Sequence, residues 1–281
     1  MDWTKLNFIF NSEINNKKRP WILSRVYNEL KIHFPKSNFY VFNRSSELFN
    51  KINKWGYINY YLWFPVFLNT DAVDVLMVCH LNNDRLSELA CEADHIVTMN
   101  TKYYDMFKSL NKPCSKVFFG VDKQFKCKLK LLVAGKNYTN VDRKNIRLLN
   151  MVKELSFVDI EFTNGKYKFE QLPNLYNSCD YVFVPSKIEG GPMSLIEGIA
   201  CGKKVIIPLD VGMAQDFIEG IIPYENNNFE SLYSVLKKLY LEKRNISKIV
   251  DHLTWENFCN ENKKILEMVY NKHYGEFINN G

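Results

Sequence analysis

The sequence predicts an α/β protein made of two Rossmann-like domains. Short apolar runs typical of buried strands alternate with stretches of helical length along the 281 residues. The alternation breaks at a polar, basic stretch over residues 122–128 and restarts at Leu129. We therefore expect residues 1–125 and residues 126–281 to form separate domains. Strands that alternate with helices pair as parallel sheets, which bind ligands at the carboxyl ends of their strands.

The first domain is expected to hold a run of buried strands separated by helices. The strand at residues 72–80 is the clearest, because its Val, Leu and Met run is typical of a strand covered on both faces. Residues 21–34 have the spacing of an amphipathic helix. The expected strands are residues 6–10, 39–42, 72–80, 95–98 and 116–121, and the expected helices are residues 21–34, 84–93 and 103–110.

The second domain repeats the pattern and ends in two helices. Its expected strands are residues 129–134, 158–162, 180–186 and 204–207, and its expected helices are residues 143–155, 169–177, 193–201, 229–243 and 255–274. No short-period repeat and no low-complexity segment interrupts the alternation.

Composition favours a globular protein of the cytoplasm. Hydrophobic residues make up 46% and aromatic residues 15% of the chain, which excludes intrinsic disorder. No secretory signal is visible near Met1, and the longest apolar stretch, residues 57–68, is too short to span a bilayer. Seven cysteines without a Cys-x-x-Cys pair indicate reduced thiols. Without an Asp-x-Asp motif or a histidine cluster, we expect no metal and no cofactor.

The net charge of +6 is concentrated in the first half of the chain. Residues 1–127 carry 17 Lys and Arg against 12 Asp and Glu, whereas residues 128–281 carry 20 against 19. Part of the excess lies in Lys17–Arg19, beside Trp21. Such a group is either a solvated loop or a contact for an anionic acceptor or an acidic, peripheral membrane surface. Nucleic acid is not an expected partner, because the excess is small and no recognition motif is present.

One segment, YNSCDYVFVPSKIEGGPMSLIEGIACGKKVII over residues 176–207, has the pattern of a phosphate-binding strand, loop and helix. Gly190 and Gly191 allow backbone to approach a ligand, and Pro192 suits a helix start. The helix N-terminus that follows offers unpaired N–H groups and a positive dipole end, which hold phosphate. Glu189 and Glu197 flank this point and can accept hydrogen bonds from hydroxyls. The segment therefore predicts a site for polyhydroxylated phosphate esters.

The same segment resembles the Glu-x7-Glu signature of the family-4 retaining glycosyltransferases, with EGGPMSLIEGIACGKKVI at the signature itself. The resemblance continues upstream in LLVAGKNYTNVDRKN (131–145) and FEQLPNLYNSCDYVFVPS (169–186), and downstream in LTWENFCNENKKILE (253–267). It is strong over residues 128–270 and faint over residues 1–127.

This resemblance implies the GT-B fold, in which two Rossmann-like domains face a cleft, and a last helix, here within residues 255–274, that crosses back to the first domain. It also implies a metal-independent, retaining transfer of a hexosyl-type sugar. The donor partner is a nucleotide diphosphate sugar, and the acceptor is a hydroxyl of a carbohydrate or glycolipid.

Site residues are carried over by their match to the family pattern. Lys144 matches the family's phosphate-binding Lys, whereas Lys136 stands where the family has an Arg, for which Arg143 can compensate. Glu197 is expected to hold the ribose, and Glu189 the hydroxyls of the donor sugar. The backbone N–H groups of the loop and helix start complete the expected diphosphate site, and they belong to Gly190, Gly191, Pro192 (which itself lacks an N–H), Met193, Ser194 and Leu195.

The first domain departs furthest from the family. His80 ends a strand where the family places a His that reaches the donor sugar, but it is equally a polar strand end. FIFNSEINNKKRPW lacks the family's Gly-rich loop. Two other readings therefore stay open, a catalytically silent nucleotide-sugar or glycan binder and a sugar-nucleotide epimerase on the same fold.

Overall fold

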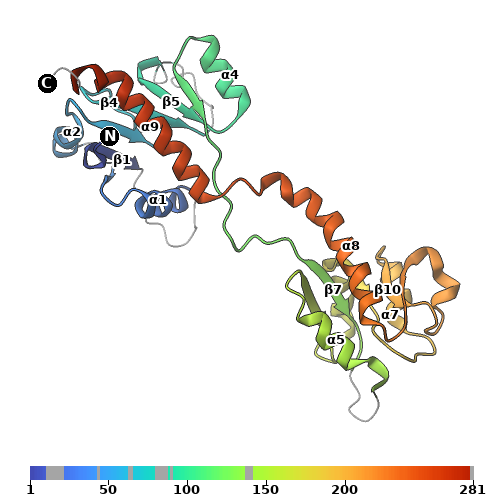
Figure 1. Ribbon diagram of the computed structural model, residues 1–281. Coiled ribbons are helices and arrows are strands. Elements are labelled where there is room, and N and C mark those ends of the chain that lie inside the picture. Colours follow the sequence, from blue (N-terminus) through green and yellow to red (C-terminus); the bar gives the residue numbers. More distant parts are fainter. Residues whose placement is uncertain are drawn as a thin grey trace. The chain divides into compact units, whose positions relative to one another are not determined.

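The computed structural model describes residues 1–10, 22–42, 45–62, 66–79, 88, 91–136 and 142–278. The chain divides into two compact units (Figure 1). Unit 1 is Met1–Lys123 with Val250–Gly281, and unit 2 is Gln124–Ile249. The sequence prediction assigned residues 126–281 to the second domain, with a last helix that crosses back to the first, and the structure groups Val250–Gly281 with unit 1.

Unit 1 is built on a six-stranded sheet of order β2-β1-β3-β4-β5-β6, and its described strand pairs are all parallel. The strands are β1 Leu6–Phe10, β2 Asn38–Val41, β3 Ile58–Tyr61, β4 Val73–Val78, β5 His95–Thr98 and β6 Cys114–Lys116. The helices are α1 Ile22–His33, α2 Ser46–Ile52, α4 Thr101–Ser109 and α9 Trp255–Ile278, with a 3-10 turn at Trp3–Lys5.

Helices cover both faces of the unit 1 sheet, because alternate strand residues point to opposite sides. One core cluster joins Phe8 and Tyr60 of the sheet to α1 and α9, and Figure 1 shows α9 lying along this sheet near β4. The other cluster joins Ile9 and Tyr61, the next residue on each strand, to α2 and α4. Burial on both faces explains why β1 and β4 are apolar at every position except Asn7 and Asp74.

The junction between α9 and the rest of unit 1 is tightly packed. Gly120 lies against the start of α9, where a Cβ would come within 2.2 Å of the Trp255 backbone nitrogen. The Trp255 indole donates a hydrogen bond to Asp122 (2.6 Å), whose other oxygen pairs with Arg25 (3.2 Å). The backbone N–H of Val121 donates to the carbonyl of Leu253. These contacts place the carboxyl-terminal segment in unit 1.

A row of polar side chains, all buried except the half-buried Asn38, crosses the unit 1 sheet. Asn38, Asn7, Asn59 and Asp74 occupy facing positions on four adjacent strands, and hydrogen bonds of 2.8–3.1 Å link each to the next. Asp74 also accepts from the backbone N–H and hydroxyl of Thr70. Burial nevertheless raises the pKa of Asp74 from 3.8 to about 6.

Unit 2 is built on a five-stranded parallel sheet of order β11-β10-β9-β7-β8. Its strands are β7 Leu129–Val133, β8 Val158–Phe162, β9 Tyr181–Phe183, β10 Val205–Pro208 and β11 Ile221–Tyr224. Its helices are α5 Ile146–Lys153, α6 Leu172–Ser178, α7 Met193–Ala200 and α8 Phe229–Ser247, with 3-10 segments at Asp142–Lys144, Phe169–Gln171, Ala214–Gly220 and Lys248–Val250.

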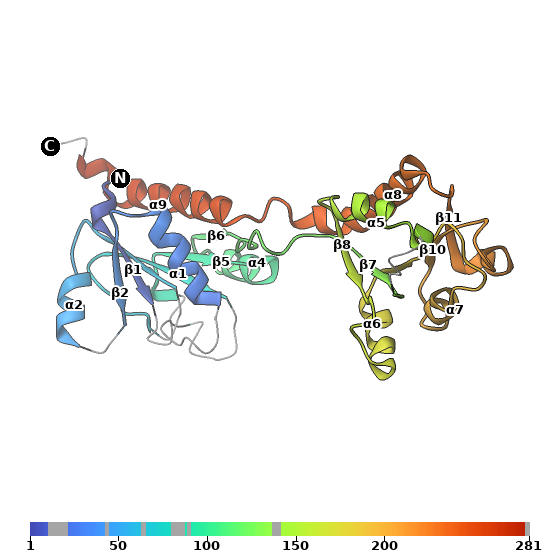
Figure 2. The same cartoon turned by 90° about the horizontal axis from the view of Figure 1, so that it is seen from below.

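Helices also cover both faces of the unit 2 sheet. On one face of the sheet, Leu131 and its neighbours pack against α5 and α8. On the opposite face, Leu132 and its neighbours pack against α6 and α7. In Figure 2, α5 and α8 accordingly lie on one side of the strands, and α6 and α7 on the other. The predicted class, α/β with parallel sheets, is confirmed in both units.

The structure corrects several element boundaries. The sequence missed α2, β3 and β11, which are short and lack a long periodic pattern. The strand expected at residues 116–121 is wrong, because only Cys114–Lys116 pairs with β5 and the following apolar residues pack against α9. The helix expected at residues 143–155 is broken at Asn145, whose φ of 51° is left-handed. Most of the helix expected at residues 84–93 lies outside the described residues.

Candidate functional site

The strand order of unit 2 creates a crevice at one point of its sheet. β7 lies between β8 and β9 in the sheet. The connection that follows β7 leads to β8 at one edge of the sheet, whereas the connection that follows β9 leads in the opposite direction, to β10. Where the connections of neighbouring parallel strands diverge, the carboxyl ends of the strands leave room for a ligand. The residues after β7 are Ala134–Lys136, and those after β9 lead to Glu189. Two separate parts of the sequence prediction therefore meet here.

A cavity of about 440 Å³ occupies this position. Nine of the twelve predicted site residues line it, namely Lys136, Arg143, Lys144, Glu189, Gly191, Pro192, Met193, Ser194 and Glu197. Its other lining residues are Ala134, Gly135, Thr163, Gly165, Tyr167 and Leu172. Of the remaining three, Gly190 lies in the same loop, Leu195 is buried in the core, and His80 lies outside the described residues.

Two cations converge on Glu189 inside the cavity. The Lys144 ammonium lies 2.5 Å from Glu189 Oε1, and the Arg143 guanidinium lies 3.2 Å from Glu189 Oε2. The Glu189 side chain is only 10% exposed, compared with 19% for Lys144 and 43% for Arg143. The left-handed turn at Asn145 separates the short segment that carries both cations from α5.

A neighbouring ion pair fixes the same segment from outside the cavity. Asp142 accepts a hydrogen bond from the backbone N–H of Ile146 at the start of α5, and its other oxygen pairs with Lys187 at 2.5 Å. The backbone N–H of Lys187 donates to the carbonyl of Arg143. The segments after β7 and β9 are thus tied together next to Glu189.

The start of α7 faces the cavity without a side-chain cap. Pro192 is its N-cap residue, and Met193 and Ser194 of its first turn line the cavity. The N–H of Leu195 already donates to the carbonyl of Pro192, so the available N–H groups of this turn lie before it. In the adjoining space, the buried hydroxyl of Ser186 has no hydrogen-bond partner among the described residues. This end of the cavity can accept an anion with several oxygens.

A glycine that the sequence analysis did not select shapes the Glu189 loop. Gly212 has a φ of 57°, and a Cβ there would lie 2.9–3.0 Å from Pro192 Cδ and from the carbonyl oxygens of Glu189 and Gly190. A larger residue would therefore displace the loop that carries Glu189.

Glu197 is held by a partner that the sequence analysis also missed. The Tyr176 hydroxyl donates a hydrogen bond of 2.5 Å to Glu197 Oε2. Tyr176 is 2% exposed, and burial, together with the hydrogen bond to Glu197, raises its pKa well above the usual value, so it remains a donor. One oxygen of Glu197 is thereby oriented, and Glu197 lines the cavity.

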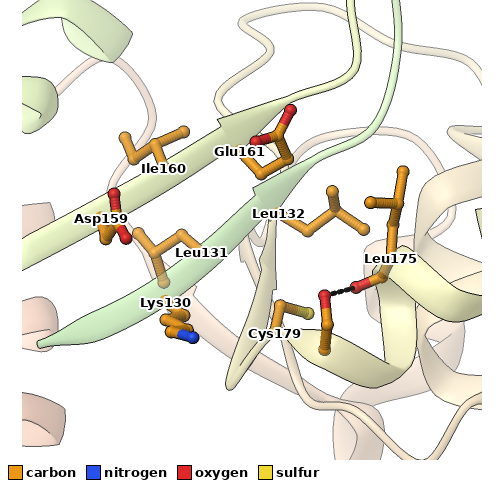
Figure 3. A pocket seen from close by; sticks show the side chains of 9 residues that line it. Lys130, Leu131, Leu132, Asp159, Ile160, Glu161, Leu175 and Cys179 are labelled. Carbon is orange, nitrogen blue, oxygen red and sulfur yellow. Dashed lines mark hydrogen bonds between the residues drawn. The ribbon is translucent and has the colours of Figure 1, made fainter. Parts of the chain in front are cut away.

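A second cavity of unit 2, of about 220 Å³, lies away from the candidate residues (Figure 3). Leu132, Leu175 and Cys179 face it from β7 and the α6 region, with Lys130 and Asp159 near its edge. It contains none of the predicted site residues and no helix start. The larger cavity at the carboxyl ends of β7 and β9 is therefore the candidate site.

Two searches of the described residues concern metals and membranes. Within the described ranges, no group of three or more His, Cys, Asp or Glu side chains is arranged to hold a metal ion. No helix in the described part of the chain is both long and apolar enough to cross a bilayer.

Residues 115–246 match the model of the protein family described as glycosyl transferases group 1. The match runs from β6 almost to the end of α8 and includes every residue that lines the cavity. An uncharacterized glycosyltransferase of Methanocaldococcus jannaschii is 30% identical over 112 residues, which are 39% of this chain. The match spans 30% of that relative's length.

Solved structures with a similar chain trace include a glycosyltransferase of Rickettsia africae, with a TM-score of 0.39 and 12% identity over 94% of this chain and 98% of that one. Sucrose-phosphate synthase of Thermosynechococcus elongatus has a TM-score of 0.39 and 10% identity over 94% and 99% of the two chains. An Anabaena protein in complex with UDP has a TM-score of 0.38 and 11% identity over 94% and 100%.

Proposed function

Because residues 115–246 match the model of the glycosyl transferases group 1 family, we propose that this chain transfers a sugar from a nucleotide diphosphate sugar to an acceptor hydroxyl. The observation that carries the proposal is the cavity at the carboxyl ends of β7 and β9. It brings together three cations, two carboxylates and an uncapped helix start, which suit the phosphates and hydroxyls of such a donor.

The cationic end of the cavity is the proposed diphosphate subsite. Negative charge builds on the diphosphate as the bond to the sugar breaks, and preorganised positive groups stabilise that charge. Lys144 and Lys136 supply two such positive groups, and Arg143 adds a guanidinium able to bind two phosphate oxygens at once. The first N–H groups of α7 point into the same region, where the helix dipole favours an anion.

The two carboxylates are proposed to bind the hydroxyl-bearing parts of the donor. Glu197, oriented by Tyr176, lines the cavity and would accept hydrogen bonds from the ribose. Glu189 lies beside the cations and would accept hydrogen bonds from the donor sugar. Its negative charge there also favours an oxocarbenium-like transition state. Retention of configuration is proposed on the resemblance of the Glu189–Glu197 segment to retaining enzymes.

Metal-independent chemistry is part of the proposal. Lys136, Arg143 and Lys144 together provide three positive charges around one cavity, and we propose that they take the place of a bridging cation. No further cofactor is proposed.

The acceptor is proposed to be a carbohydrate or glycolipid that binds with the help of unit 1. His80, which the resemblance places near the donor sugar, and the basic group Lys17–Arg19 lie outside the described residues. The net positive charge of residues 1–127 supports an anionic acceptor or contact with an acidic membrane surface.

A donor panel tests this function. The full chain is incubated with UDP-, GDP- and TDP-sugars, with and without simple glycoside acceptors, while free nucleoside diphosphate and the donor sugar are followed. A transferase releases nucleoside diphosphate faster with an acceptor present. An epimerase alters the sugar without an acceptor, and a silent binder gives neither product, so either result would overturn the proposal.

A further inference from the structure

The cations of the candidate site already hold an anion supplied by the chain itself. Glu189 makes a 2.5 Å contact with Lys144 and lies 3.2 Å from Arg143, and its side chain is only 10% exposed. Both cations belong to the proposed diphosphate subsite. A carboxylate and a phosphate group both accept hydrogen bonds from ammonium and guanidinium groups, so the two anions compete for Lys144 and Arg143.

We propose that Glu189 is a specificity-determining residue that occupies the diphosphate subsite and is displaced more readily by a donor that carries its sugar than by a free nucleoside diphosphate. This inference rests on the proposed function. When a diphosphate binds Lys144, it displaces the Glu189 carboxylate. The carboxylate is then a charged group in a largely buried position and needs new hydrogen-bond donors. The hydroxyls of an attached sugar supply them. A free nucleoside diphosphate lacks the sugar and leaves the carboxylate unpaired beside its phosphates.

The contacts of Glu189 support such a displacement. Its Oε2 atom is close enough to Arg143 for an ion pair but not aligned for a hydrogen bond, and no other described group hydrogen-bonds to it. The residue is followed by Gly190 and Gly191, which restrict the backbone least. The Oε1 atom of Glu189 is therefore hydrogen-bonded, whereas its Oε2 atom has only the ion pair with Arg143, as expected of a carboxylate that exchanges partners.

The consequence is a preference for substrate over product. The intact donor replaces each contact that Glu189 loses, whereas the nucleoside diphosphate left after transfer does not. The returning carboxylate then competes with the product for Lys144 and promotes its release. Glu189 thus sets the relative affinity of donor and product, in addition to its contact with the sugar.

Calorimetry with inorganic pyrophosphate tests the competition directly, at low ionic strength where charge effects are largest. Glu189→Gln removes the charge with little change in shape, and we expect it to bind pyrophosphate at least tenfold more tightly than the wild type. Asp180→Asn is the matched control, because it removes one negative charge from a carboxylate of the same unit that pairs with Lys243, away from the cavity. We expect its affinity to change by less than threefold.

Three results would overturn the inference. They are an unchanged or weaker affinity of Glu189→Gln for pyrophosphate, an equal gain in Asp180→Asn, and a gain in Glu189→Gln that persists when Lys144→Ala is added. Glu189→Ala serves as a second variant, and thermal unfolding of each protein verifies the fold.

A second arm compares the nucleoside diphosphate with the intact nucleotide sugar identified by the donor panel. The wild type should favour the nucleotide sugar at least tenfold, and Glu189→Gln should lose most of that preference by binding the free diphosphate more tightly. An identical preference in both proteins would contradict the role in specificity. If no nucleotide binds to any variant, the proposed function fails, and the pyrophosphate arm still decides whether Glu189 occupies the anion subsite.

Discussion

Removing the Lys144 ammonium should slow sugar transfer strongly while leaving the fold intact. Its side chain is 19% exposed, so its charge is partly shielded from solvent, unlike the 43% exposed Arg143. An ammonium about 4 Å from a phosphate oxygen interacts by roughly 4 kcal/mol at an effective dielectric constant of about 20. Loss of one preorganised contact to a developing negative charge typically costs about 2–4 kcal/mol.

At about 1.4 kcal/mol per factor of ten, Lys144→Ala should lower kcat/KM by roughly 30-fold to several hundred-fold. The assay is release of nucleoside diphosphate from the cognate donor, with saturating acceptor and with melting temperatures measured in parallel. Lys153→Ala is the control, because it removes the same charge from the far end of α5, away from the cavity. Turnover of Lys144→Ala within twofold of the wild type, or an equal loss in Lys153→Ala, would refute the reasoning.

Four further outcomes are expected. Tyr176→Phe should weaken nucleoside diphosphate binding by roughly tenfold, since a hydrogen bond to a charged group contributes about 1.5–3 kcal/mol, and calorimetry should show a loss at least as large in Glu197→Ala. Transfer should persist in excess EDTA, and its loss there with recovery on adding Mn²⁺ would contradict the metal-free proposal. Gly120→Ala should destabilise unit 1 by several kcal/mol in urea unfolding, because its Cβ overlaps the α9 backbone, whereas Gly275→Ala within α9 should be nearly neutral. Because the folded-state pKa of Asp74 is raised, its stabilising contribution is full below about pH 4 and is lost as pH rises through about 6; the loss should reach at most about 3 kcal/mol and be absent from Asp74→Asn.

The sequence alone was sufficient to predict the fold class and most strands. Val73–Val78 and Leu129–Val133 are apolar except for Asp74 and Lys130, and strands of this composition need burial on both faces wherever they lie in a sheet. The local chemistry of the Glu189 loop was equally readable, because a strand, two glycines, a proline and a helix start follow one another within a few residues. The local sequence pattern did not predict α2 and β3, because both elements are too short to show a clear periodicity.

Tertiary structure decided which of these local features meet. Lys144 and Glu189 are 45 residues apart, and their contact depends on β9 pairing with β7, with β8 on the far side, an order that no local periodicity specifies. The Tyr176–Glu197 hydrogen bond likewise depends on α6 and α7 packing on the same face of the sheet. Periodicity determines which residues an element buries, because side-chain direction repeats along the backbone. Which buried faces come together depends on strand order and helix packing, and these are settled by the folding of the whole unit.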